Sequence, residues 1–363
     1  MAKKLENNNF DTKEIEVWYD NEFKIFEILA IKITNLIKEI IEHKGIKYHS
    51  ITYRIKDKNS LLNKVKNKKY KDPMSQIHDY IGIRIVTFVK SDVEKVCKEI
   101  EELFEIDTEN SSNKSEELGE DKVGYRSIHY VAKIDDKREK MPEYAYLKGK
   151  CFEIQVRTIL EHAWADISHD RTYKFNEKLP QENDIRRRFA LASASLEMVD
   201  REFDRLSREM EKYSEKVAKE TENGILSYQI DSTSLLVYLC GKFKNEIKNK
   251  TVVATFNGID KEIIDELNAL GVNTIEQLDN IFNEQSESDL SDILDAFNTQ
   301  FESQNFIGIL RLIMLLHFKN KYFEKTLSED SVMTMEKADL DIICNFYPEL
   351  KEVIAGSHIE IIN

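Results

Sequence analysis

The segment CFEIQVRTILEHAWADISHDRTYK, residues 151–174, changes abruptly from strand periodicity to helix periodicity. In its first half apolar residues alternate with polar ones, and the polar set is Glu153, Gln155 and Arg157. Successive side chains of a β-strand point to opposite faces, so these three polar groups would lie together on one face. A half-buried strand with a solvated polar face gives the same pattern, and other segments must therefore decide whether this face is a site.

The composition predicts a globular protein of two domains. The chain has 363 residues, of which 41% are hydrophobic, so it exceeds one typical domain and can build substantial cores. The formal net charge of -14 argues against general affinity for nucleic acid or anionic membranes. A local basic patch can still act within an acidic protein, so such a patch must be found in the sequence.

The cysteines and the apolar runs predict the compartment. No signal peptide is recognisable, and the cysteines lack CxxC spacing, so we expect a cytoplasmic protein with reduced thiols rather than disulfides or zinc. These residues are Cys97, Cys151, Cys240 and Cys344. The longest apolar run, residues 306–318, contains Arg311 and is too short to span a bilayer, so we expect a core helix and no membrane partner.

The hydrophobic pattern places a domain boundary near residue 224. Residues 1–223 alternate strand and helix patterns, which predicts an α/β (α+β) domain. A packing helix is expected over residues 14–43 and a long amphipathic helix over about 185–222. Strands are expected over residues 48–55, 81–88 and 126–134 and from 151 onward.

Two local details and the second domain complete this outline. Ser91 and Glu94 have the spacing of a capping box that opens a helix, and the polar residues 110–122 are expected to form a mobile loop. Residues 224–363 show helical patterns with little strand signal, so we expect a mainly helical domain of unknown function. Its acidity favours ordinary helical packing over contact with nucleic acid.

A basic segment stands out in this acidic chain. Residues 53–71, YRIKDKNSLLNKVKNKKYK, contain eight basic residues against a single acid. Ser60 and Lys64 lie one helical turn apart on one face. Arg54 and Lys56 lie just upstream, so hydroxyl, ammonium and guanidinium groups can converge on a polyphosphate. A solvated lysine face is the simpler alternative if this segment is taken alone.

A second polar group lies at the entrance of an apolar strand. In QIHDYIGIRIV, Asp79 precedes the strand and Arg84 projects within it. A carboxylate at a strand end can bind Mg²⁺, which takes one or two carboxylates and fills its other positions with water and substrate phosphates. Glu153 is the candidate partner, although an isolated Asp79 would be interpreted as a turn or cap residue.

The third group is VGYRSIH, in which Tyr125, Ser127 and His129 share one strand face. Gly124 permits an unusual backbone approach, so the tyrosine ring can serve as a stacking platform for a base, and His129 can meet a phosphate. A buried aromatic residue with a hydrogen-bonded histidine is the alternative. The chain contains no Walker A, GxGxxG, HExxH or GxSxG motif, so phosphate chemistry depends on these three groups and the strand from Cys151.

Taken in order, these segments resemble a known family. RIKDKNSLLNK, HDYIGIR, GYRSIH and EIQVRT followed by HAWADISHDRTYK are similar to the motifs of the RelA/SpoT-type alarmone synthetase domain. The resemblance covers about residues 48–174 and implies a nucleotidyltransferase-like mixed sheet flanked by helices. It implies transfer of pyrophosphate from ATP to the ribose 3′-hydroxyl of GDP or GTP, which makes (p)ppGpp. Neither the hydrolase domain nor the regulatory C-terminus of long members is recognisable, so we expect a stand-alone small synthetase.

The resemblance also implies roles for individual residues on the ATP side. Arg54 matches the arginine that stacks on the adenine. The ATP phosphates would be held by Lys56, Ser60, Lys64 and Arg84. Asp79 and Glu153 match the two acids around Mg²⁺, and Glu153 is also the expected base for the acceptor hydroxyl. Phosphoryl transfer depends chiefly on positioning and charge neutralisation, which suits these residue types.

On the acceptor side, Tyr125 matches the tyrosine that stacks on the base. The expected lining residues are His129, Gln155, Arg157 and Lys122. Two departures from the family pattern bear on this side. Residues 109–121, ENSSNKSEELGED, contain neither the RxKD nor the ExDD element of long members, which leaves the metal requirement open. Asp121 occupies the place of a common lysine and Lys122 lies one step closer to the tyrosine, which leaves open how the acceptor phosphates are held.

Three functions remain open at this level. The first is synthesis of (p)ppGpp. The second is a toxic small synthetase that pyrophosphorylates the 3′ CCA end of tRNA or adenine nucleotides, with residues 224–363 as an acceptor-binding or neutralising module. The third, a catalytically inactive nucleotide-binding regulator, is disfavoured because Asp79 and Glu153 are both present. A homo-oligomer is also compatible with the resemblance.

Overall fold

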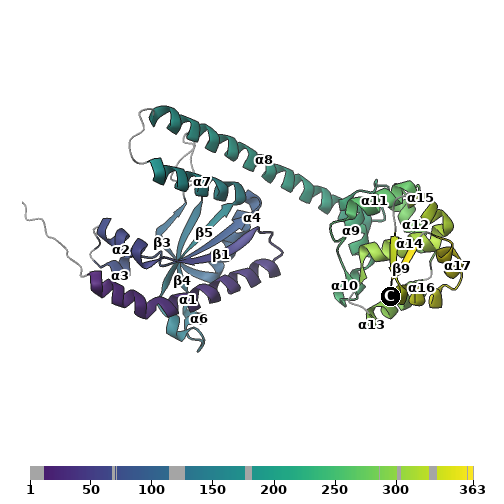
Figure 1. Ribbon diagram of the computed structural model, residues 1–363, viewed down its shortest axis with the longest axis horizontal. Helices are drawn as coiled ribbons and strands as arrows, with labels where there is room; N and C mark the ends of the chain where they lie inside the picture. Colours follow the sequence, from purple (N-terminus) through teal and green to yellow (C-terminus); the bar gives the residue numbers. More distant parts are fainter. Residues whose placement is uncertain are drawn as a thin grey trace, which may run out of the picture. The chain divides into compact units, whose positions relative to one another are not determined.

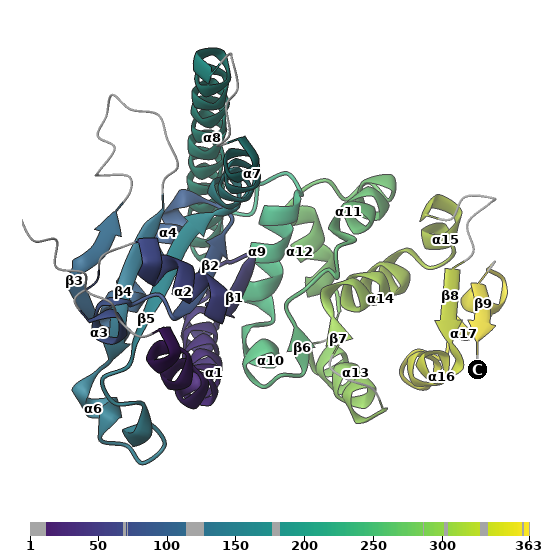
Figure 2. The same cartoon turned by 60° about the vertical axis from the view of Figure 1, so that its left-hand side comes forward.

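The computed structural model divides the chain into two compact units, Met1–Arg208 and Glu209–Asn363. The described residues are 12–67, 70, 72–113, 127–175, 182–285, 287–300, 304–326, 333–357 and 359–362. The division falls inside the long helix α8 (Glu182–Glu222), whose end lies next to the boundary that the sequence places near 224. The folds of the two units are shown in Figure 1 and, in a second view, in Figure 2.

The first unit is built on a five-stranded mixed sheet, as predicted. Its strand order is β1-β2-β5-β4-β3, in which β2 and β5 are parallel and the other neighbours are antiparallel. The strands are β1 (Ser50–Ile55), β2 (Ile81–Thr87), β3 (Phe104–Asn113), β4 (Ile128–Ile134) and β5 (Cys151–Thr158). The parallel pair brings the polar residues of β2 and β5 to the centre of one sheet face.

Strand β3 was not predicted, and the loop expected from residue 110 is wrong for residues 110–113, which belong to this strand. The sequence of β3, FEIDTENSSN, is mostly polar because the strand lies at the edge of the sheet and buries only Phe104 completely. An edge strand needs no apolar alternation, so its sequence carries little strand signal. Residues 114–122 of the expected loop lie outside the described residues.

Two helices cover the apolar face of this sheet. The helix α1 (Thr12–His43) buries Ile33, Ile37 and Ile41 at helical spacing, and α4 (Lys90–Leu103) adds a second apolar stripe to the same core. The other elements of this unit are α2 (Lys58–Asn67), α3 (Pro73–Gln76), α6 (Asp136–Glu139), the 3-10 turn η1 (Ala145–Leu147) and α7 (Ile159–Phe175). The opposite, polar face carries the candidate site.

The predicted capping box of Ser91 and Glu94 is wrong. Helix α4 begins at Lys90, and Val89 at the cap position makes no side-chain cap hydrogen bond. The backbone N–H of Ser91 instead donates to the Asp204 carboxylate on α8, at 2.6 Å. A distant helix therefore supplies the cap that the local sequence was expected to supply.

The second unit is mainly helical, as predicted. Its helices are α9 (Ser232–Lys242), α10 (Lys244–Lys248), α11 (Asp260–Ala269), α12 (Ile275–Asn283), α13 (Glu287–Gln300), α14 (Phe306–Phe318), α15 (Asn320–Thr326), α16 (Lys337–Phe346) and α17 (Leu350–Ala355). The two short parallel pairs of this unit were not predicted from the sequence. They are β6 (Val252–Val253) with β7 (Gln304–Asn305) and β8 (Met333–Glu336) with β9 (Ile359–Ile362).

Helix α14 is the buried helix that the apolar run predicts, and most of its side chains lie in the core of the second unit. Its one charged residue, Arg311, is compensated by Glu266 on α11, whose carboxylate accepts a hydrogen bond of 2.5 Å from the Arg311 guanidinium. The Tyr322 hydroxyl donates to the same carboxylate at 3.1 Å. The four cysteines have free thiols, and of these only Cys97 is fully buried. Among the described helices, none is both long and apolar enough to cross a membrane.

Candidate active site on the polar face of the sheet

The polar face of the sheet gathers predicted site residues from three adjacent strands. Residues in register on neighbouring strands point to the same face. Arg84 of β2, Gln155 of β5 and His129 of β4 are in register and form one row. Arg54 and Glu153 each pair with Gly82 and belong to the next row. The sequence prediction that these strands present their polar groups together is therefore confirmed.

A hydrogen-bonded chain connects five side chains across this face. The links join Ser127, His129, Glu153, Gln155 and Arg157 in that order. The His129 ring lies 2.9 Å from Glu153 Oε1 through Nδ1 and 2.5 Å from the Ser127 hydroxyl through Nε2. The Gln155 amide donates to Glu153 Oε2 at 2.9 Å, and the Arg157 guanidinium donates to Gln155 Oε1 at 2.5 Å. Both oxygens of Glu153 are thus held in fixed positions.

The hydrogen bonds to its two neighbours set the charge of Glu153. Burial by itself would raise the pKa of Glu153, but the hydrogen bonds from His129 and Gln155 outweigh burial, and its pKa lies below the ordinary value. Asp79 is near enough for its negative charge to oppose this lowering. Glu153 is therefore an ionised carboxylate in a mostly dry setting, oriented by two neighbours and able to accept a proton from a bound group.

Asp79, in the turn between α3 and β2, is the second carboxylate of the site. Its Oδ2 accepts from Lys56 at 2.5 Å and from Lys64 at 2.8 Å. Burial alone would raise the pKa of Asp79, but the two lysines outweigh burial and lower it. The other oxygen, Oδ1, is buried and has no hydrogen-bond partner among the residues that the structure describes. A buried carboxylate oxygen without a partner is costly, so this atom is placed to meet a bound cation or donor.

Sequence reasoning gave no role to His162, in the first turns of α7. Burial is the main cause that lowers the pKa of His162, and Asp166 opposes it. Arg157, Arg84 and His49 lower this pKa further, which means that these groups lie close to the His162 ring. The signal that could have found it is its position, because His162 follows the polar strand β5 by a single helical turn.

The remaining predicted residues are less tightly placed. Arg54 is exposed on β1. Ser60 is exposed in the first turn of α2, where its backbone N–H donates to Asp57 at 2.9 Å. Lys122 and Tyr125 lie outside the described residues. The structure therefore brings together Lys56, Lys64 and Asp79 in one cluster and the residues around Glu153 in another.

The donor set constrains the metal that this face could hold. Within the described part of the chain, no group of three or more His, Cys, Asp or Glu side chains is arranged to hold a metal ion. Asp79 offers one free carboxylate oxygen and Glu153 lies nearby. Such a set is too small for zinc or calcium, but it fits Mg²⁺, which binds one or two carboxylates together with water and substrate phosphates.

The comparisons with known proteins point to one family. Residues 53–178 match the region found in RelA / SpoT proteins. GTP pyrophosphokinase YwaC of Bacillus subtilis (strain 168) is 29% identical over 136 residues, which are 36% of this chain and 60% of YwaC, so the chain spans less than two thirds of that relative. GTP pyrophosphokinase YjbM of the same organism is 27% identical over 174 residues, which are 47% of this chain and 76% of YjbM.

One solved structure is also similar to part of this chain. The crystal structure of the small alarmone synthetase 1 from Bacillus subtilis aligns with 55% of this chain and 98% of that chain, at 22% identity and a TM-score of 0.42. The family match covers the strands and helices that carry Arg54, Asp79, His129 and Glu153. Residues 53–178 of this chain are therefore similar to the region found in RelA / SpoT proteins.

Proposed function

We propose that the first unit is a pyrophosphokinase that transfers pyrophosphate from ATP to the ribose 3′-hydroxyl of GDP or GTP and makes (p)ppGpp. The observation that carries this proposal is the pair of ionised carboxylates, Glu153 and Asp79, on a face that also holds Lys56, Lys64 and Arg84. The two relatives named as GTP pyrophosphokinases support the same reaction.

The chemistry follows from the positions of these groups. The 3′-oxygen of the acceptor attacks the β-phosphorus of ATP, the bond between the α- and β-phosphates breaks, and AMP leaves. Glu153 takes the proton of the 3′-hydroxyl, because it is ionised and its two oxygens are fixed by His129 and Gln155. His129 and Gln155 thus act as positioning residues for the base.

In this proposal Lys56 and Lys64 bind the phosphates of ATP as well as Asp79. Both now donate to Asp79 Oδ2, and both lie in the basic segment that precedes and includes α2. ATP phosphates carry more negative charge than one carboxylate, so we expect the two ammonium groups to turn toward the phosphates when ATP binds. Arg54 would stack on the adenine, while Ser60 and Arg84 would complete the phosphate contacts.

Magnesium is part of the proposal because the donor set suits it. Asp79, through its unpartnered Oδ1, and Glu153 would hold the ion together with water and ATP phosphates. The ion would neutralise charge that develops on the transferred phosphates. Asp79 gains freedom to bind a cation once phosphates draw Lys56 and Lys64 away from its other oxygen.

The acceptor side includes residues outside the described ranges, so its assignment rests on the resemblance. Tyr125 would stack on the acceptor base, and Lys122, His129 and Arg157 would face the acceptor phosphates. A chain that uses ATP and a guanine nucleotide would act in the cytoplasm. The net charge of -14 speaks against tRNA as the acceptor, because tRNA binding needs a large basic surface.

One experiment tests both the reaction and the acceptor. The purified chain is incubated with Mg²⁺ and ATP labelled at the β-phosphate, together with GDP, GTP, ATP or deacylated tRNA in separate reactions. We expect label on GDP or GTP and release of AMP. Label on tRNA or on an adenine nucleotide alone would replace the guanine acceptor while keeping the reaction. A folded protein that binds nucleotides but labels no acceptor would refute the enzymatic proposal.

A further inference from the structure

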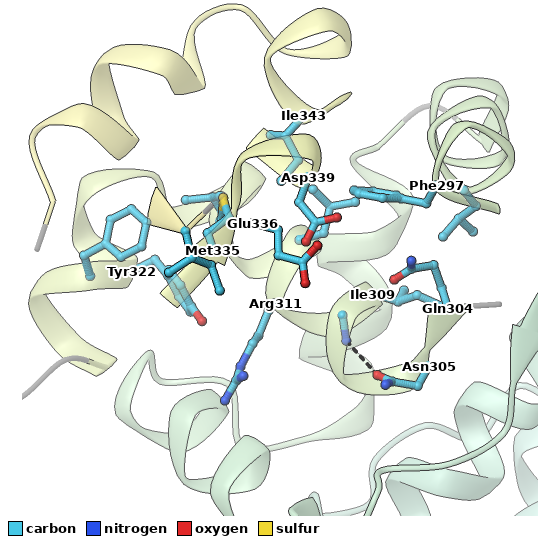
Figure 3. Close-up of a pocket in the computed structure, with 16 residues that line it drawn as sticks. Phe297, Gln304, Asn305, Ile309, Arg311, Tyr322, Met335, Glu336, Asp339 and Ile343 are labelled. Carbon is cyan, nitrogen blue, oxygen red and sulfur yellow. Dashed lines mark hydrogen bonds between the residues drawn. The ribbon is translucent and has the colours of Figure 1, made fainter. Parts of the chain in front are cut away.

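The second unit contains a cavity that takes no part in the proposed transfer. Its volume is about 530 Å³, which is within the range of small-molecule sites. Figure 3 shows its lining, which comes from α13, β7, α14, α15, the β8–α16 junction and β9. Every lining residue belongs to the second unit, so the cavity is a feature of this unit alone.

Most of the cavity wall is apolar. The wall includes Leu294, Phe297, Ile309, Leu312, Leu315 and Ile343, which are all buried. These side chains come from three helices and would surround an alkyl chain or an aromatic ring. Burial of such a group stabilises a complex by about 25 cal/mol per Å² of apolar surface, so the wall favours a ligand with an apolar body.

The polar end of the cavity is acidic. In Figure 3 the carboxylates of Glu336 and Asp339 lie close to each other among the lining residues, at the start of α16. Asp339 is half-buried and Glu336 is exposed, so this end of the cavity opens to solvent. Neither carboxylate caps this helix, and among the described residues neither forms an ion pair. Burial raises the pKa of Asp339, and the negative charge of Glu336 raises it further.

The one cationic residue of the lining is already compensated. Figure 3 shows the Arg311 guanidinium turned away from Glu336 and Asp339, and it binds the Glu266 carboxylate through two of its nitrogens. The Asn305 carboxamide oxygen is likewise occupied, because it accepts from the backbone N–H groups of Ile307 and Gly308. Among the described lining residues, the carboxylates of Glu336 and Asp339 are therefore the charged groups without an oppositely charged partner, and Gln304 and Asn305 add neutral carboxamides.

We propose that this cavity binds a small organic cation whose ammonium or guanidinium head lies between Glu336 and Asp339 and whose apolar body fills the rest. An anion would meet two carboxylates and no free cation. A bare metal ion would find only two carboxylates in an apolar wall, too few oxygen ligands for Ca²⁺. An amphipathic amine satisfies both parts of the lining at once, because its head forms charge-assisted hydrogen bonds and its body stays dry.

Calorimetric titration of the full chain tests this inference without any nucleotide, so its result is independent of the transfer activity. The probes are 4-phenylbutylamine, 4-phenylbutanol and 4-phenylbutyrate, which share one apolar body and differ in charge. We expect the amine to bind about tenfold more tightly than the alcohol, or about 1.4 kcal/mol, and the carboxylate to bind most weakly. Equal affinity for the three probes, or no binding of the amine, would overturn the proposal.

Variants locate the binding site. Asp339→Asn and Glu336→Gln should each remove most of the preference for the amine over the alcohol while leaving alcohol binding unchanged. Asp341→Asn is the matched control, because Asp341 lies on the same helix as Asp339 but outside the lining. An amine preference that survives both cavity substitutions places the amine elsewhere and refutes the assignment.

A second measurement needs no variant. An ammonium head beside Asp339 lowers the pKa of that carboxyl, so binding of the amine should release protons. Titrations at about pH 4, where an aspartic acid with a raised pKa is largely protonated, in two buffers of different ionisation enthalpy measure this release. Amine binding with no proton release, or with proton uptake, would contradict contact with Asp339 even if a variant failed to fold.

Discussion

The polar face of the first unit and the cavity of the second both contain partly buried carboxylates, but the neighbouring groups shift the pKa of these acids in opposite directions. Burial is the largest influence on the pKa of Glu153, Asp79 and Asp339 alike. Glu153 and Asp79 have neighbours that donate hydrogen bonds and lower the pKa, whereas Asp339 has a second acid beside it, which raises the pKa further. The neighbouring groups, and not burial alone, decide whether the pKa of such an acid is lowered or raised.

We expect the largest effect on activity from a substitution that removes the charge of Glu153. Glu153→Gln keeps the size of the side chain but can neither accept a proton nor carry charge, so we expect the turnover number to fall by about a hundredfold or more. The measurement is the rate of AMP release with saturating ATP and acceptor. Glu105→Gln, an exposed position on β3 of the same sheet, is the control and should keep its rate. Near-normal turnover of folded Glu153→Gln would remove Glu153 from the mechanism.

The next largest effect concerns Asp79. Asp79→Asn removes the carboxylate that two lysines now hold, so we expect the Mg²⁺ concentration for half-maximal rate to rise by about tenfold or more. A magnesium titration at fixed ATP measures the change. An unchanged titration curve in a folded protein would show that Asp79 does not contact the metal.

The third prediction concerns Glu161, a buried acid of the first unit whose pKa is raised, as is that of Asp339 in the second unit. Burial raises the pKa of Glu161 to about 7, Asp200 contributes to the rise, and the Thr158 backbone N–H, which donates at 2.9 Å, only partly opposes it. Between the unfolded value near 4.5 and pH 7 the folded chain holds a proton that the unfolded chain has lost. This contribution to stability is therefore complete below about pH 4.5 and is lost as the pH rises through 7.

Glu161→Gln removes this titration, so at pH 8 we expect the variant to be more stable than the parent by on the order of 1 to 3 kcal/mol. At pH 5 the two proteins should differ much less. Urea unfolding of the first unit at both pH values gives the comparison, and Glu102→Gln, at an exposed position on α4, is the control. A gain at pH 5 equal to that at pH 8 would show that the effect is not due to ionisation.

The smallest expected effect comes from separating the two units. A chain that ends at Glu222 keeps every described residue of the candidate site and the whole core of the first unit. We expect its transfer rate per folded molecule to stay within about twofold of the full chain, because units with separate cores usually fold alone. A well-folded but inactive truncation would mean that the second unit completes the active site.

Local patterns predicted the elements whose signal lies in their own residues. The alternation in β5 gave Glu153, Gln155 and Arg157 a common face, and the apolar run of 306–318 gave the buried helix α14. Glu153 was also named as the candidate metal partner of Asp79, and the charge of Asp79 does influence the pKa of Glu153.

Features that depend on distant contacts were missed. Strand β3 is polar because it lies at an edge, and only the finished sheet defines that edge. The cap of Ser91 comes from Asp204, 113 residues later in the chain. The environment of His162 and the acidic end of the cavity arise from side chains of several elements, and no local spacing encodes such a meeting. Sequence periodicity reports burial within one element, whereas these sites depend on which elements meet.

The contacts of α8 also set a time order during synthesis. Asp204 caps the start of α4, and Asp200 accepts a hydrogen bond from the buried Thr158 at the end of β5, at 3.0 Å. A ribosome that adds about 5–20 residues per second needs about 6–23 s to pass from Ser91 to Asp204. During that interval the sheet and its two covering helices can assemble, but the start of α4 lacks its cap. A nascent chain therefore completes the first unit only after α8 has left the ribosome, when the residues of the second unit are already being made.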